Sequence, residues 1–201
     1  MSEYDPILPT RRVSRDREQV EALFRAAAGP YLRSPWGWFA WSVALPAAAL
    51  ATGSIARWKG PSGVLLLWSL TILAAGLVEA VPHLRLREQG GGSALATWAM
   101  RGQANLSVVG VCLSAVLLWS DQAWLLPGLW LLLLGHSLYL LGGLTFHPLR
   151  TCGLGMQLGG ALALWPRIDP LLTFAFTTAL ANAFVGWSIL RARRDEEGTE
   201  S

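Results

Sequence analysis

Residues 123–145 read AWLLPGLWLLLLGHSLYLLGGLT, a stretch without a single Asp, Glu, Lys or Arg. About 20 apolar residues in a helix cross a hydrocarbon core about 30 Å thick. Hydrocarbon also requires each backbone polar group to be paired within the protein, which a helix achieves alone. The stretch therefore predicts a transmembrane helix.

Further apolar segments lie on both sides of it, at 36–57, 63–83, 98–119, 150–165 and 170–190. The 201 residues are 53% hydrophobic and 14% charged, whereas soluble domains are about 25% charged. We therefore expect an all-α fold: one polytopic membrane helical bundle of six transmembrane helices, within residues 36–190.

The basic residues predict the orientation, because cytoplasmic loops of membrane proteins are rich in Lys and Arg. One side of the predicted membrane holds only Arg57, Lys59 and Arg167 of the 16 Lys and Arg residues. The opposite side holds the remainder: Arg11, Arg12, Arg15, Arg17, Arg25, Arg33, Arg85, Arg87, Arg101, Arg150, Arg191, Arg193 and Arg194. This places both termini in the cytoplasm, which agrees with an even number of spans. The net charge of +3 then reflects membrane orientation and not a nucleic-acid partner.

The segment before the first span has two parts. Residues 1–13 are polar and predict a disordered tail, and residues 14–35 predict a leader helix and linker. Within 14–28, one helical face carries the apolar residues Val20, Leu23, Phe24 and Ala27. Such a helix lies on the inner leaflet or contacts a cytoplasmic partner; a solvated helix that only leads into the membrane is the alternative. At the other end, 191–201 predicts a cytoplasmic tail.

Polar side chains are rare in the spans, and six of them fall at similar depth. At 1.5 Å per residue they lie within roughly 5–13 Å of the cytoplasmic boundary. Their convergence predicts a polar pocket for a small ligand, open to the cytoplasm and built from Glu79, Arg101, Asn105, His136, Gln157 and Asn182.

The two charged members of this set allow a simpler interpretation. A charge inside the bilayer costs at least about 2.5–3.5 kcal/mol, so Glu79 and Arg101 are expected to pair across the second and third spans. Such a pair either clamps two helices or provides the acidic group of a ligand or proton site. The second role suits a small permease or channel that uses Glu79 and His136.

Histidines add a redox or metal alternative. His83 and His136 on adjacent spans offer imidazoles for haem iron, and Glu79 would complete a carboxylate and imidazole metal set. Two haem ligands need matched depth, and His83 lies at the interface whereas His136 lies deeper. Neither cofactor is therefore the leading expectation.

Catalytic motifs are not recognisable in the sequence. It has no P-loop, GxSxG or HExxH motif and no clustered aspartates. Cys112 and Cys152 fall at different depths, too far apart for a disulfide. We expect a protein without enzymatic activity.

Glycines recur where helices are expected to pack. Gly128, Gly135 and Gly142 are seven residues apart, and Gly155 and Gly159 form a GxxxG step. Small residues let helix backbones approach closely in lipid. Packing inside the chain is the first interpretation, and dimerisation the second.

Residues 125–164, LLPGLWLLLLGHSLYLLGGLTFHPLRTCGLGMQLGGALAL, resemble a group of small uncharacterised bacterial six-span membrane proteins. The shared features are a Pro-Gly-x-Trp segment, a Gly-Gly turn and a Gly-rich fifth span, with a less distinct match at 14–45. Such proteins are often encoded beside a winged-helix regulator. The resemblance implies a bacterial inner-membrane protein that is the regulator's membrane partner or its regulated product, and it supplies no catalytic residues.

Overall fold

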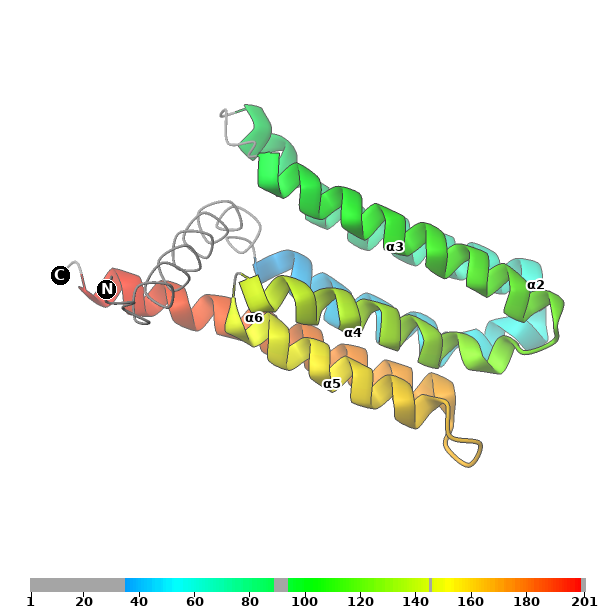
Figure 1. Cartoon of the computed structure of the whole chain (residues 1–201). Coiled ribbons are helices and arrows are strands. Elements are labelled where there is room, and N and C mark those ends of the chain that lie inside the picture. Colours follow the sequence, from blue (N-terminus) through cyan, green and yellow to red (C-terminus); the bar gives the residue numbers. More distant parts are fainter. Residues whose placement is uncertain (1–34, 89–93, 145, 200–201) are drawn as a thin grey trace, which may run out of the picture.

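The structure is a computed structural model that describes residues 35–88, 94–144 and 146–199. Helices account for every regular element in these ranges, and Figure 1 shows the long ones running broadly along one direction. The elements are α2 (Pro35–Glu88), α3 (Ala94–Trp119), the short 3-10 helix η1 (Ala123–Leu125), α4 (Leu126–Leu144), α5 (His147–Ala163) and α6 (Pro170–Thr199). The described part is therefore all-helical, as the composition predicts.

Helix α2 is two helices joined at Gly60. Gly60 has φ 65° and ψ −163°, a backbone conformation that is essentially restricted to glycine. Pro61 follows, and proline disfavours the α conformation in the residue before it. The chain reverses direction here (Figure 1), so the two halves of α2 correspond to the first two predicted apolar segments.

Three helices extend beyond the predicted segments. Residues 84–88 and 94–97, which lie between the predicted segments 63–83 and 98–119, belong to α2 and α3. Helix α6 likewise continues through the predicted tail to Thr199. Leu, Arg, Glu and Ala dominate these extensions and are strong helix formers, whereas glycine, which occupies positions 90–92 in the sequence between them, is not.

Four stretches of the described helices are long and apolar enough to cross a membrane: Pro35–Val78, Arg101–Trp119, Ala123–Gly142 and Pro170–Asp195. The first of these includes the reversal at Gly60. Helix α5 has only 17 residues, the lower limit of the usual spanning length of about 17–25. Large apolar side chains point outward, for example Val43, Leu158 and Phe176, each 68% exposed. Soluble monomers rarely expose wide apolar surfaces, so this arrangement suits a hydrocarbon environment.

Helices α4 and α5 form the closest pair. The carbonyl oxygen of Gly153 lies 2.7 Å from where a Cβ on Gly135 would be, and the carbonyl of Gly160 lies 3.1 Å from such a Cβ on Gly128. Gly142 directly faces the backbone of Arg150. A side chain at any of these positions would separate the helices. A seven-residue spacing keeps one helical face toward a neighbour and favours a small crossing angle of about 20° between the helices.

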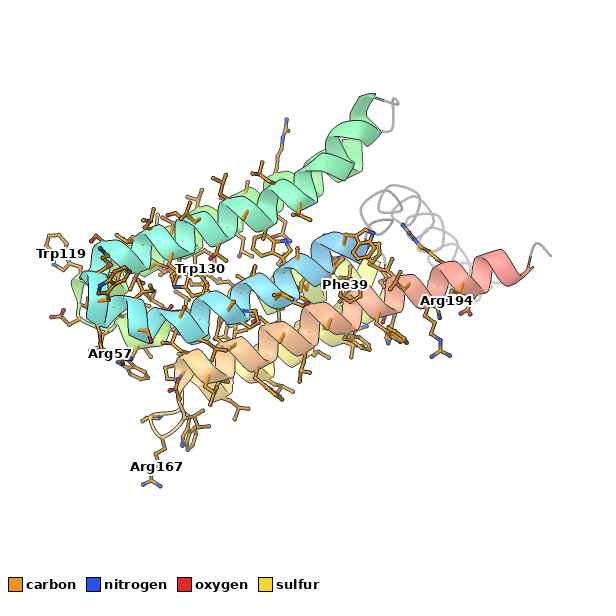
Figure 2. The ribbon with its side chains drawn as sticks, turned by 180° about the vertical axis from the view of Figure 1, so that it is seen from behind. Phe39, Arg57, Trp119, Trp130, Arg167 and Arg194 are labelled. Atoms are coloured by element: carbon orange, nitrogen blue, oxygen red, sulfur yellow. The ribbon has the colours of Figure 1, made fainter. Side chains whose placement is uncertain are left out.

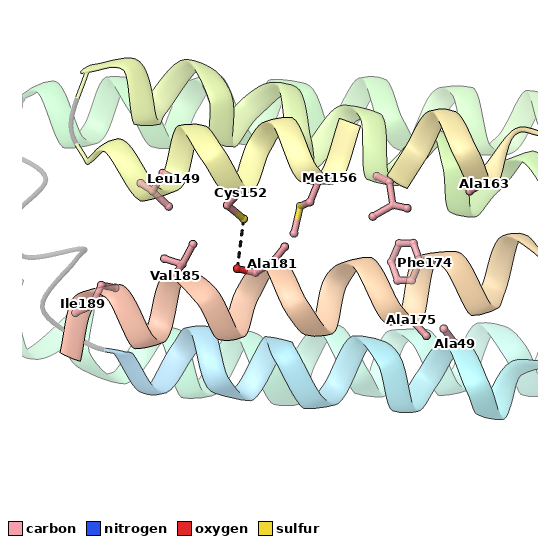
Figure 3. Close-up of a cluster of buried hydrophobic side chains, with 11 residues drawn as sticks. Ala49, Leu149, Cys152, Met156, Ala163, Phe174, Ala175, Ala181, Val185 and Ile189 are labelled. Atoms are coloured by element: carbon pink, nitrogen blue, oxygen red, sulfur yellow. Dashed lines mark hydrogen bonds between the residues drawn. The ribbon is translucent and has the colours of Figure 1, made fainter. Parts of the chain in front are cut away.

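The main apolar cluster lies where α5 meets α6 (Figure 3). Met156 and Cys152 of α5 and Phe174 and Val185 of α6 are each no more than 4% exposed. On the other side of α6, Ala49 of α2 and Ala175 belong to the same cluster, and Phe39 lies against Gly186. Alanine and glycine at these contacts let α2 approach α6 closely. Small residues thus decide which helices are neighbours.

Candidate functional site

The buried polar side chains of the described residues are Ser137, Thr178 and Asn182. Thr178 Oγ1 donates to the carbonyls of Phe174 and Ala175, at 2.8 and 3.2 Å. Asn182 Nδ2 donates to the carbonyl of Thr178 at 2.8 Å. Thr178 and Asn182 therefore find hydrogen-bond partners within α6 itself, as polar groups buried away from water require.

The interface between α3 and α4 contains two further polar contacts. Gln103 Nε2 donates to Ser137 Oγ across it. Trp130 Nε1 donates to Ser114 Oγ at 3.1 Å, and that hydroxyl donates to the carbonyl of Gly110 at 2.7 Å. Gln103 was not among the predicted site residues, although an amide side chain within an apolar segment is rare enough to have indicated it.

The two halves of α2 repeat the same arrangement. Trp68 Nε1 donates to Thr52 Oγ1 at 3.1 Å, and Thr52 Oγ1 donates to the carbonyl of Ala48 at 2.7 Å. In both helix pairs, the two halves of α2 and the pair α3 and α4, the tryptophan follows the Thr or Ser by 16 residues. Figure 2 shows Trp130 between two layers of helices. We call these two contacts the Trp clamps.

The Trp clamps predict a measurable loss of stability. Trp130→Phe and Trp68→Phe keep most of the ring but remove the indole donor and leave a partly buried hydroxyl with one bond fewer. Each should lower the unfolding free energy by about 1 kcal/mol and the melting temperature by about 3 °C. Circular dichroism melts in detergent measure this. Trp119→Phe is the control because Trp119 is 92% exposed; equal effects of all three changes would contradict the assignment.

The predicted pocket residues point in different directions where their side chains are described. Asn182 is buried and Gln157 is half-buried, whereas Arg101, Asn105 and His136 are exposed. On α3, the face toward α4 carries Gly110 and Gln103. At 100° per residue, Arg101 lies on the opposite side of α3 from Gly110. The described side chains therefore do not surround one common space.

Glu79 and His83 belong to α2, but their side chains lie outside the described part, as do residues 1–34 with Val20, Leu23, Phe24 and Ala27. The Glu79 and Arg101 pair and the amphipathic segment 14–28 thus remain predictions. Among the described residues, no three His, Cys, Asp or Glu side chains gather as a metal site would need. Cys112 is exposed and Cys152 buried, and neither is in a disulfide.

The predicted packing glycines separate into two groups. Gly128, Gly135 and Gly142 face α5, as described above. The GxxxG step is split, because Gly159 lies against Thr177 of α6, whereas a Cβ on Gly155 would meet no atom within 4 Å. The glycines of α5 that oppose α4 are instead Gly153 and Gly160, which the same seven-residue spacing would have indicated.

Aromatic and basic side chains mark both ends of the bundle. Lys59 Nζ lies 4.2 Å from the centre of the Trp58 ring. At the other end, Arg150 donates to Tyr139 Oη at 2.8 Å and stacks 4.8 Å from the ring centre. A shallow apolar hollow lies beside Trp119, at the end of the molecule that also carries Arg57 and opposite to Arg194 (Figure 2). It lies far from the predicted polar pocket.

The fold defines a class, that of all-helical proteins with helices long and apolar enough to span a membrane. No family model matches the chain, and searches of the curated proteins and of the solved structures likewise return no match.

Proposed function

We propose that the chain is a six-span protein of a bacterial inner membrane, with both termini in the cytoplasm. It acts without catalysis, as a sensor or as the membrane partner of a cytoplasmic regulatory protein. The sequence resemblance suggests this context, and the basic residues suggest the orientation. The segments predicted to lie outside, 58–62, 120–122 and 166–169, are short, which leaves recognition to the cytoplasmic side and to the membrane.

One observation carries the choice of a regulatory role over transport. The buried side chains of the described helices are apolar apart from Ser137, Thr178 and Asn182, and all three have hydrogen-bond partners within the chain. Intramembrane ionisable residues of transporters face the bundle interior or a water-filled cavity. His136 is exposed instead. This arrangement supports a closed bundle more than a solute pathway.

The small ligand of the proposed sensor would bind at the cytoplasmic side, near Glu79 and Arg101. Asn182 is less suited to it, because its amide nitrogen already bonds to the backbone of α6. Haem and metal binding gain no support from the described side chains. The proposal therefore depends on cytoplasmic contacts and on the tail and leader segment that precede α2.

Deletion of residues 1–28 tests the proposed role. We expect the shortened protein to stay in the membrane, because the apolar helices follow the deleted arm. We also expect affinity capture from native membranes to recover a cytoplasmic protein with the full chain but not with the shortened one. If the full chain and the shortened chain capture the same proteins, the proposed role as partner of a cytoplasmic regulatory protein is contradicted. Solute flux in proteoliposomes that Glu79→Gln abolishes would favour the permease instead.

Reporter fusions at both termini and in the segment 164–169 test the orientation. Cytoplasmic reporters should be active at both termini, and an export-dependent reporter only in the loop. The converse pattern would contradict the proposed orientation, and reporters that place the termini on opposite sides would contradict six spans.

A further inference from the structure

The outward side of the α4–α5 pair carries polar groups at membrane depth. Gly135 faces the backbone of α5, and Ser137 contacts Gln103 of α3. Since successive helical residues differ by 100°, His136 points between these neighbours and away from the bundle, and it is exposed. It lies eight residues from the end of α4 at Leu144, a depth of about 12 Å.

Gln157 of α5 lies on the same side of this pair. It sits between Met156, which is buried toward α6, and Leu158, which is 68% exposed. Its Cγ is 2.9 Å from where a Cβ on Gly135 would lie. Nearer the cytoplasmic end, Arg150 and Tyr139 bond to each other on this side. We call His136, Tyr139, Arg150 and Gln157 the outer seam.

Two members of the outer seam are unsatisfied. Within the described ranges neither His136 nor Gln157 has a hydrogen-bond partner, whereas Arg150 and Tyr139 pair with each other. In Figure 1 the α4–α5 pair lies on the near side of the molecule, with α6 behind it. An unpaired polar group in hydrocarbon costs several kcal/mol. Polar side chains in spans are accordingly found against protein or water.

We propose that the outer seam is the interface with a second copy of this chain, related by a two-fold axis along the membrane normal. A neutral imidazole and a primary amide each contain both a donor and an acceptor. They can therefore be satisfied by the same residues of an identical partner, as an isologous interface demands. Leu140 and Leu158, 54% and 68% exposed, supply the apolar packing beside them. The inference rests on the proposed membrane placement.

Cysteine crosslinking in native membranes tests the proposal. The background is Cys112→Ala, which removes the exposed native thiol and keeps the buried Cys152. Leu140→Cys should give an oxidised adduct of twice the chain mass. Val43→Cys, on α2 and 68% exposed, is the control and should stay monomeric. Equal crosslinking at both positions would overturn the proposal, as would an adduct with a different protein.

Removal of the polar groups of the outer seam provides a second test of the proposal. His136→Leu and Gln157→Leu should each weaken self-association about tenfold in lipid dilution measured by single-molecule photobleaching. Ser107→Ala, at an exposed residue of α3 whose hydroxyl already donates to the carbonyl of Gln103, should leave self-association unchanged. A monomer at all dilutions, in protein that resists carbonate extraction, overturns the self-association alone and indicates lipid against the seam. Release of the protein by carbonate overturns the membrane placement as well.

Discussion

Gly153→Ala should lower the unfolding free energy by about 3 kcal/mol, near the upper range for overpacked interiors. A Cβ at this position would lie 2.4 Å from the backbone nitrogen of Tyr139 and 2.6 Å from the carbonyl oxygen of Gly135. Backbone atoms cannot rotate away as a side chain can, so α4 and α5 must separate along their whole contact. We expect the melting temperature in detergent to fall by about 10 °C.

Gly155→Ala is the matched control, two residues away on the same helix. A Cβ there meets no atom within 4 Å, and alanine is about 1 kcal/mol more favourable than glycine in a helix. The melting temperature should therefore stay the same or rise slightly. If both substitutions lower it equally, the loss comes from glycine replacement in α5 generally, and the close α4–α5 contact is not its cause.

Gly60→Ala should lower the unfolding free energy by about 2 kcal/mol for a different reason. No atom lies within 4 Å of a Cβ at Gly60, so the cost is not a clash with a neighbour. It arises from the backbone, because φ 65° and ψ −163° are strained for any residue with a Cβ. The alternative is a straighter α2, which would pull Trp68 away from Thr52 and Phe174.

The same thermal measurement, with Gly76→Ala as the control, checks this. Gly76 lies in the second half of α2 and also has open space at its Cβ, but its φ is not positive. Only the change at Gly60 should lower the melting temperature, by about 5 °C. A stable Gly60→Ala protein would show that the reversal tolerates an ordinary residue.

The predicted site was less accessible to sequence reasoning than the helices. Depth along a helix follows from counting residues, and depth alone groups His136, Asn182 and Gln157. Direction around a helix depends on which face meets a neighbour. Asn182 faces the buried side of α6, whereas His136 faces away from the bundle. Residues at one depth therefore need not share one pocket.

The Trp clamps illustrate the same limit. Trp68 lies near the outer end of the apolar segment 63–83, and indoles at the ends of transmembrane helices favour the headgroup region. The structure places it against the apolar cluster, with its nitrogen bonded to Thr52 and its ring 5.7 Å from that of Phe174. Trp58 and Trp119 are 73% and 92% exposed, as boundary residues would be. Sequence position alone does not separate the two kinds of tryptophan.

The sequence by itself determined the all-helical class, the apolar segments and the chain reversal near Gly60, because these depend on local composition and on backbone conformation. It also contained the seven-residue glycine spacing that α4 presents to α5. Only the tertiary structure decided that Gly153 and Gly160 complete this contact, that Gly155 does not, and that His136 and Gln157 lie on an outward seam. The physical reason is that, in hydrocarbon, nearly any face of an apolar helix can be exposed to lipid at little cost in free energy. The choice among faces comes from close packing between helices that are distant in sequence.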